Sequence, residues 1–435
     1  MGFVKGRLGI MMFLQYAVWG FWLPVLSTYL QTETAKGGLG FTPGQVGWIL
    51  GSAASIGALT APFVAGQLAD RYFSTERFLA VLLVVGGVLQ WIVSYQTDYT
   101  TWLVLSAVYS ICYQPTIALT NSLAFSHLKD ANNEFPMVRV WGTIGWIAVS
   151  WLFPMVWLLT DLKAYSLPPF YEGVPVADQT ARLVDAMKFS GTLSIVYAAF
   201  CFFLPHTPPK KDATESFAVA KAFALLKRPS FAVLVAASLP ISVVHNIYFM
   251  QTSPFLVDAV GINLSSVQPA MSIGQFAEIF VMAALGMMLT KLGFRTTLIM
   301  GGAAYVLRYA IFGAFAGLPT ELVVASQALH GFCFSCFFAA AFIYVDRIAD
   351  ADVRHSAQTV FGIIILGIGP VIAAPTLDFL TKNFKLDDGT LNYSALWYTL
   401  SAIALVTTIF VGVFFRDETS GRDGALATEE EPAVG

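Results

Sequence analysis

Apolar runs recur along the chain, and short breaks rich in charged residues, proline or glycine separate them. A helix of about 20 apolar residues is long enough to cross the hydrocarbon layer of a bilayer. The pattern therefore predicts an all-α membrane protein with about twelve transmembrane helices. The expected spans lie at residues 8–30, 44–68, 78–96, 101–126, 138–160, 188–205, 229–256, 268–290, 296–316, 320–345, 356–380 and 393–415.

The breaks differ in charge, and this difference predicts the orientation of the chain. With the N-terminus in the cytoplasm, 16 of the 24 Lys and Arg residues lie in cytoplasmic segments and six lie on the opposite side. Cytoplasmic loops of membrane proteins carry an excess of Lys and Arg. We therefore expect both termini to be cytoplasmic. Arg139 and Arg308 are the two that fall within or at the edge of spans.

An even number of spans and a basic central connection predict two halves. The segment Gly66 to Arg71 joins spans two and three, and the segment Gly286 to Lys291 joins spans eight and nine with the same spacing from glycine to the basic residue. Transporters are commonly built from such repeats, with the ligand between them. The expected domains are an N-terminal six-helix bundle at 1–205, a cytoplasmic linker at 206–228, a C-terminal six-helix bundle at 229–415, and a disordered cytoplasmic tail at 416–435.

The composition narrows the class of protein further. The chain is 57% hydrophobic and only 12% charged, with a net charge of −3, so neither a soluble fold nor nucleic-acid binding is expected. The first apolar run continues to about Leu30 without a cleavage signal, and we expect it to stay in the membrane. Cys333 and Cys336 form a CxxC without a second ligand pair, so no metal or other cofactor is expected. The spans contain no nucleophile–base motif, and we expect no enzyme.

Ionisable and polar residues inside spans are costly in lipid and therefore indicate function. On four expected spans they recur at helical spacing, which places them on one face of each helix. These residues are Arg139, Thr143 and Trp146; His245 and Tyr248; Gln275 and Glu278; and His330 and Phe334 with Ser335 beside them. Four such faces from both halves predict a polar central cavity. Its aromatic, amide and hydroxyl groups suit a neutral ligand with a planar ring and several hydroxyls, and suit a sugar nearly as well.

Each of these residues also has a simpler interpretation. His245 and His330 are typical helix–helix hydrogen bonders. Arg139, near a cytoplasmic helix start, is consistent with a residue that only sets topology, and Arg308 with a structural pair to another helix; we assign Arg308 no role. A sugar or oligosaccharide:proton symporter or, less readily, a non-transporting membrane sensor also fits the pattern.

Three longer segments carry a family resemblance: residues 13–22, 135–145 and 272–278, together with the shorter His355-Ser-Ala-Gln358. They resemble the nucleoside:proton symporter family, the bacterial nucleoside permeases of the major facilitator superfamily. The loop Gly66-x-x-x-Asp70-Arg71 resembles a signature of that superfamily and is expected to act as a conformational latch. The resemblance implies proton-coupled nucleoside uptake across the cell inner membrane by alternating access, by a protein that works as a monomer.

The resemblance also implies roles for individual residues. Arg139, Thr143, Gln275 and Glu278 correspond to family positions that contact the nucleoside. The other positions that correspond to the family's site are Trp146, His245, Tyr248, His330 and Phe334. The better-known permeases carry an aspartate directly after that phenylalanine, where this chain has Ser335. Glu278, facing Arg139 across the cavity, is therefore the expected proton carrier, with His245 and His330 as alternatives.

Overall fold

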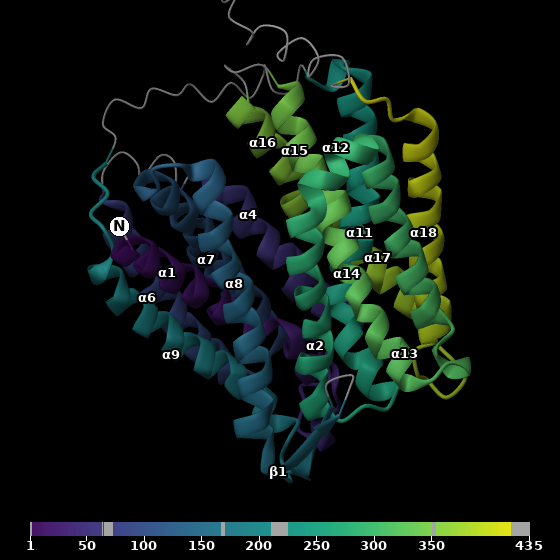
Figure 1. The fold of residues 1–435 in the computed structure, drawn as a ribbon. Helices are drawn as coiled ribbons and strands as arrows, with labels where there is room; N and C mark the ends of the chain where they lie inside the picture. The colour runs from purple at the N-terminus through teal and green to yellow at the C-terminus, as the bar shows by residue number, and fades with distance from the viewer. Residues whose placement is uncertain are drawn as a thin grey trace, which may run out of the picture.

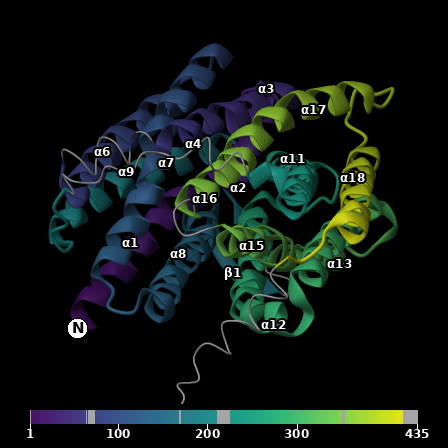
Figure 2. The same cartoon turned by 90° about the horizontal axis from the view of Figure 1, so that it is seen from above.

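A computed structural model describes residues 2–62, 64, 73–166, 170–209, 225–349 and 354–418. The helices form two bundles, with α1, α4, α6, α7, α8 and α9 in one and α11 to α18 in the other (Figure 1). The view from above places α2, α4 and α16 near the middle of the molecule, where the two bundles meet (Figure 2). The α-helices are α1 (Gly2–Gly20), α2 (Leu23–Gln31), α3 (Pro43–Gly47), α4 (Ala54–Pro62), α6 (Thr75–Ser94), α7 (Tyr99–His127), α8 (Ala131–Phe153), α9 (Asp185–Phe200), α11 (Pro229–Asp258), α12 (Val267–Gly313), α13 (Thr320–Ala325), α14 (Leu329–Phe332), α15 (Ala340–Ile348), α16 (Arg354–Gly362), α17 (Gly369–Asn383) and α18 (Tyr393–Phe414).

Several spans contain wider π-helical turns or shorter 3-10 turns. The π-helical segments are η2 (Trp48–Ala53), η4 (Pro154–Leu158), η11 (Cys333–Ala339) and η12 (Ile363–Ile368). The 3-10 turns are η1 (Thr34–Lys36), η5 (Ala181–Val184), η6 (Cys201–Phe203), η7 (Leu225–Lys227), η8 (Leu264–Ser266), η9 (Phe315–Gly317) and η10 (Ser326–Ala328).

Ten helical segments in the described part are long and apolar enough to cross a membrane. One of them, Leu264–Gly313, contains two predicted spans, which meet at Gly293 with φ 75° and ψ 170°. Only glycine adopts that backbone conformation readily, so the helix breaks there. The span predicted at 44–68 is helical up to Pro62, and part of it lies outside the described residues. The predicted membrane fold is thus confirmed.

Three predictions fall wholly or partly outside the described residues. These are the latch residues Gly66, Asp70 and Arg71, most of the linker (210–224), and the tail from residue 419 onward. The predicted domain boundaries therefore remain predictions.

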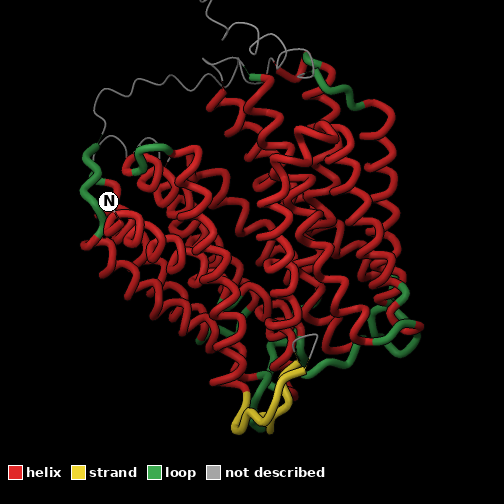
Figure 3. The backbone as a smooth tube through the Cα atoms, in the orientation of Figure 1, coloured by secondary structure: helices red, strands yellow, loops and turns green. Residues whose placement is uncertain are grey.

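A two-stranded antiparallel hairpin follows α8, with β1 at Leu159–Ser166 and β2 at Phe170–Pro175 (Figure 3). The sequence analysis expected only helices, so this hairpin is an addition to the predicted fold. The Tyr171 backbone N–H donates to Ser266 Oγ at 2.9 Å, and the Tyr171 hydroxyl donates to the Trp151 carbonyl at 2.9 Å. Burial raises the pKa of the Tyr171 phenol to about 12, so it remains a donor. The hairpin thereby connects α8 with the segment that begins α12.

The two bundles touch at the end of the molecule that carries this hairpin, which we call the hairpin end. In the described part, every hydrogen bond between bundles is near this end. Ser27 and Gln31 donate to the Met250 carbonyl, and Gln268 Nε2 donates to the Phe21 carbonyl at 2.8 Å. Toward the opposite end, where α9 ends at Phe200 and α11 begins at Pro229 and which we call the linker end, the helices of the two bundles diverge (Figure 1).

Glycine lets α1 and α8 approach closely within the N-terminal bundle. A Cβ atom on Gly145 would lie 2.2 Å from the Phe13 carbonyl oxygen and 2.9 Å from its carbonyl carbon. Because both atoms belong to the backbone of α1, a side chain at this position forces the helices apart. Small residues serve this purpose at helix contacts in membranes.

We therefore expect Gly145→Val to lower the stability of the purified protein by about 1–3 kcal/mol, since overpacked sites typically lose that much. Gly286→Ala is the matched control, because nothing lies within 4 Å of a Cβ at Gly286. Thermal unfolding in detergent measures both variants. An unchanged melting temperature for Gly145→Val contradicts the close contact between α1 and α8.

Candidate functional site

Three predicted site residues lie on α8, and two of them are held by α1. The Arg139 guanidinium lies 3.9 Å from the centre of the Tyr16 ring, and the Trp146 ring packs edge-on against Trp19 at 5.6 Å. Thr143 lies between them in sequence and is half-buried. Because α8 begins at Ala131, Arg139 lies more than two turns inside the helix. The Arg139 guanidinium therefore packs against α1 inside the bundle.

Gln275 and Glu278 lie one turn apart on α12, and both are half-buried. Arg139 is the charged group that acts on Glu278 across the boundary between the bundles. Among the described residues, however, no ion pair within 4.0 Å joins these two side chains. The two charged side chains are therefore not in direct contact, and the expected role of Glu278 opposite Arg139 remains a prediction.

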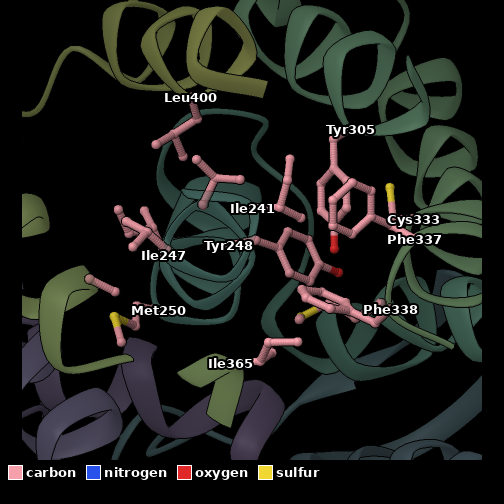
Figure 4. Close-up of a cluster of buried hydrophobic side chains, with 14 of the residues drawn as sticks. Ile241, Ile247, Tyr248, Met250, Tyr305, Cys333, Phe337, Phe338, Ile365 and Leu400 are labelled. Atoms are coloured by element: carbon pink, nitrogen blue, oxygen red, sulfur yellow. The ribbon is translucent and has the colours of Figure 1, made fainter. Parts of the chain in front are cut away.

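A tightly packed aromatic cluster holds the predicted residues of the C-terminal bundle. His245 and His330 stack with ring centres 5.5 Å apart, and His330 also stacks on Tyr248 at 5.6 Å. The Tyr305 hydroxyl hydrogen-bonds His245 Nδ1 at 2.7 Å. Tyr248 and Tyr305 belong to a buried cluster that also includes Cys333, Phe337 and Phe338 (Figure 4). The two histidines therefore stack on each other inside the C-terminal bundle, and both have further partners within it.

Arg308, to which the sequence analysis gave no role, lies at the centre of this cluster and is fully buried. Its guanidinium donates to Gln327 Oε1 at 2.8 Å and bonds His330 Nδ1 at 3.1 Å. It also lies 3.5 Å from the centre of the Tyr248 ring, and the Tyr248 hydroxyl donates to Gln327 Oε1 at 2.9 Å. A charge inside a span was itself a signal of function. Gln327, three residues before His330, was a second signal that the sequence analysis missed.

Phe334 and Ser335 lie in the π-helical segment η11. Phe334 is half-buried, whereas Ser335 is fully buried and its hydroxyl has no hydrogen-bond partner among the described residues. Single π-helical turns occur frequently at functional sites. Cys333 and Cys336, in the same segment, are free thiols.

Unpartnered buried polar atoms gather where α12, η10 and η11 meet. In the described part they include Gln275 Oε1, Gln327 Nε2, Arg308 Nε and Ser335 Oγ. Buried polar groups are nearly always paired with protein or with ordered water. Helix α12 also touches His330 directly, because a Cβ on Gly274 would lie 2.8 Å from the His330 Cβ. Gln275 and Glu278 therefore lie on the part of α12 that packs directly against the segment carrying His330.

Comparison with known proteins identifies the family. Residues 2–420 match the family model described as Nucleoside H+ symporter. The chain belongs to this family. It is 30% identical to the putative nucleoside transporter YegT of Escherichia coli over 94% of this chain and 93% of that protein. The xanthosine permease of Escherichia coli is 28% identical, over 94% of each chain.

Solved structures of other transporters have a fold similar to that of this chain. The nucleoside transporter NupG superposes with a TM-score of 0.79, at 22% identity, and the match covers 95% of this chain and 99% of that one. A D-xylose–proton symporter gives a TM-score of 0.71 at 13% identity, covering 96% of this chain and 98% of that one. The protein therefore has the major facilitator fold and is a multi-pass membrane transporter, not an enzyme. The family, fold and class predicted from sequence are confirmed.

Proposed function

We propose that this protein carries nucleosides with protons across the bacterial cytoplasmic membrane, binding them between its two bundles. The observation that carries the proposal is that α8, which carries Arg139 and Thr143, packs across the bundle boundary against α12, which carries Gln275 and Glu278. These four residues offer amide, hydroxyl and charged groups, and Trp146 and Phe334 add aromatic side chains. The match to nucleoside transporters over nearly the whole chain supports the same ligand class.

In this proposal, the nucleobase stacks on Trp146 or Phe334. The ribose hydroxyls and ring nitrogens bond Arg139, Thr143, Gln275 and Glu278, and His245, Tyr248, His330 and Ser335 complete the site. Glu278 carries the proton, and no cofactor takes part. A neutral Glu278 weakens the attraction to Arg139 between the bundles, which lets them rock.

The arrangement of the bundles supports alternating access. They are hydrogen-bonded at the hairpin end and diverge toward the linker end (Figure 1). With both termini and the linker in the cytoplasm, this is an inward-facing conformation. The transporter acts as a monomer in the lipid bilayer, because each chain contains both halves of the site.

Uptake into membrane vesicles tests the ligand class. We expect labelled uridine to enter in a proton-dependent manner, and unlabelled nucleosides to compete according to their base. Xylose and maltose are the controls for the sugar-transport alternative, since that chemistry shares much of the cavity. Competition by sugars without competition by nucleosides contradicts the proposal.

A further inference from the structure

The Arg308 guanidinium is a buried positive charge whose partners among the described residues are all uncharged groups. They are the Gln327 carbonyl oxygen, the His330 imidazole and the rings of Tyr248, Tyr309 and Phe312. Arginine stays protonated in proteins, so this charge does not depend on pH. The side chain is fully buried and cannot itself reach a ligand in this conformation. Its effect on the site must pass through the side chains that it holds.

The direction of one hydrogen bond follows from this chemistry. Guanidinium nitrogens donate hydrogen bonds and never accept them. In the 3.1 Å contact between Arg308 Nη1 and His330 Nδ1, the imidazole nitrogen must therefore be the acceptor. A neutral imidazole carries one ring hydrogen, so this hydrogen is on Nε2. A second proton on Nδ1 would break the bond and place two cations side by side.

We propose that Arg308 keeps His330 neutral, with its ring hydrogen on Nε2, so that His330 donates to an acceptor on the ligand and does not carry the transported proton. Arg308 is thus a positioning residue that acts through His330. The part of this proposal that concerns the ligand rests on the proposed function. The part that concerns the state of the imidazole does not.

The surroundings of His330 agree with a fixed neutral ring. The titratable and charged groups in contact with the ring are His245 and Tyr248 from α11, which stack on it, and Arg308 from α12, which bonds it. Glu278, also on α12, approaches the neighbouring Gly331 through its backbone, and among the described residues no carboxylate is bonded to the ring. A proton on His330 would therefore meet a cation and gain no anion.

The opposite edge of the ring lies against α12. His330 Cδ2, which is bonded to Nε2, would lie 3.2 Å from a Cβ on Gly274, the residue before Gln275. Gln275 Oε1 is buried without a partner. An Nε2–H donor beside an amide acceptor can hydrogen-bond to a carbonyl oxygen and to a neighbouring N–H group of one ligand. Nucleobases with a keto oxygen next to a ring N–H, as in uracil and hypoxanthine, present this pair.

Nitrogen NMR of the full-length protein, labelled at its histidines, tests the state of the ring without any ligand. The chain has five histidines, and loss of one signal set in His330→Gln assigns His330. We expect the neutral Nε2–H form to persist from about pH 5 to 8, the range in which histidine ordinarily titrates. A charged imidazole within that range, or a hydrogen on Nδ1, overturns the proposal.

Two Arg308 variants separate positioning from a structural role. In Arg308→Met, His330 Nδ1 loses its donor, so the ring hydrogen is expected to distribute over Nδ1 and Nε2. In Arg308→Lys, which keeps a charged donor, the ring hydrogen is expected to stay on Nε2. If it stays entirely on Nε2 in Arg308→Met as well, Arg308 is not what fixes the ring. The wild-type measurement keeps the proposal falsifiable should Arg308→Met fail to fold.

Binding of uridine to purified protein tests the ligand part. His330→Leu should weaken binding roughly 5- to 100-fold, as expected for a lost hydrogen bond that leaves its partner unpaired. His330→Gln keeps an N–H donor and should lose less. Equal binding by wild type and His330→Leu contradicts the donor role. Absence of binding in the wild type contradicts the proposed function and leaves the NMR result intact.

Discussion

Replacement of Glu278 by glutamine is expected to abolish proton-driven accumulation of nucleoside while leaving movement down a gradient in place. Glutamine keeps the size and hydrogen-bonding capacity of the side chain but cannot exchange a proton. It mimics the neutral form of Glu278 permanently. Because Arg139 on the other bundle is a charged group that acts on Glu278, the variant also removes an attraction that the proton controls.

The size of this effect follows from the driving force. One proton that enters with each neutral nucleoside through about 100 mV supplies about 2.3 kcal/mol, enough for roughly 50-fold accumulation. We expect the Glu278→Gln variant to reach an inside-to-outside ratio of about 1, whatever the external pH. The measurement is labelled uridine uptake into energised vesicles, compared with counterflow in vesicles without a proton gradient.

A matched control makes the result specific. Glu321→Gln is the same chemical change at an exposed position in the first turn of α13, and should accumulate uridine like the wild type. Undiminished accumulation by Glu278→Gln, with its pH dependence retained, would show that another group carries the proton. His245, bonded to the Tyr305 hydroxyl, would then be the first group to test.

A disulfide across the hairpin end is expected to stop transport completely and reversibly. Thr28 on α2 and Ser253 on α11 are both buried, and their hydroxyl groups hydrogen-bond to each other between the bundles. Cysteines with Cβ atoms about 3.5–4.5 Å apart can form a disulfide. The double variant Thr28→Cys/Ser253→Cys is therefore expected to cross-link under oxidising conditions and to lose all uridine uptake, because the hairpin end can no longer open.

Reduction should restore uptake, and each single variant should keep it under both conditions. Uridine binding to the oxidised protein should persist, since the linker end is not restrained. The native cysteines Cys112, Cys201, Cys333 and Cys336 are free, and the single variants control for them. Full uptake by the cross-linked protein would mean that the bundles do not separate at the hairpin end, which contradicts alternating access there.

The sequence allowed the spans, the family and most of the polar positions to be predicted, because lipid imposes long apolar helices and makes every polar residue within them conspicuous. The break at Gly293 fell between two predicted spans for the same reason. The hairpin was missed since residues 159–175 are short, mixed in polarity and outside the apolar runs.

Contacts between helices were beyond the reach of the sequence. Arg308 on α12 meets Gln327 and His330 only after the chain has turned back through α13, so nothing in its own span showed its partners. Similarly, the Tyr16 ring that supports Arg139 is on another helix, far away in sequence. Whether a polar residue faces a ligand or another side chain depends on such tertiary contacts.

The π-helical turn at Cys333–Ala339 affects how this chain should be compared with its relatives. Each residue of an α-helix advances the facing direction by about 100°, and a π-helical turn accommodates one extra residue before the α-helical path resumes. If two chains have this π-helical turn at different positions, their sequences can align without gaps although the aligned side chains face different directions. The residue that occupies the spatial position of the relatives' aspartate is therefore not settled by alignment to Ser335. Superposition of the backbones, and not sequence alignment, identifies the side chain that occupies the position of that carboxylate.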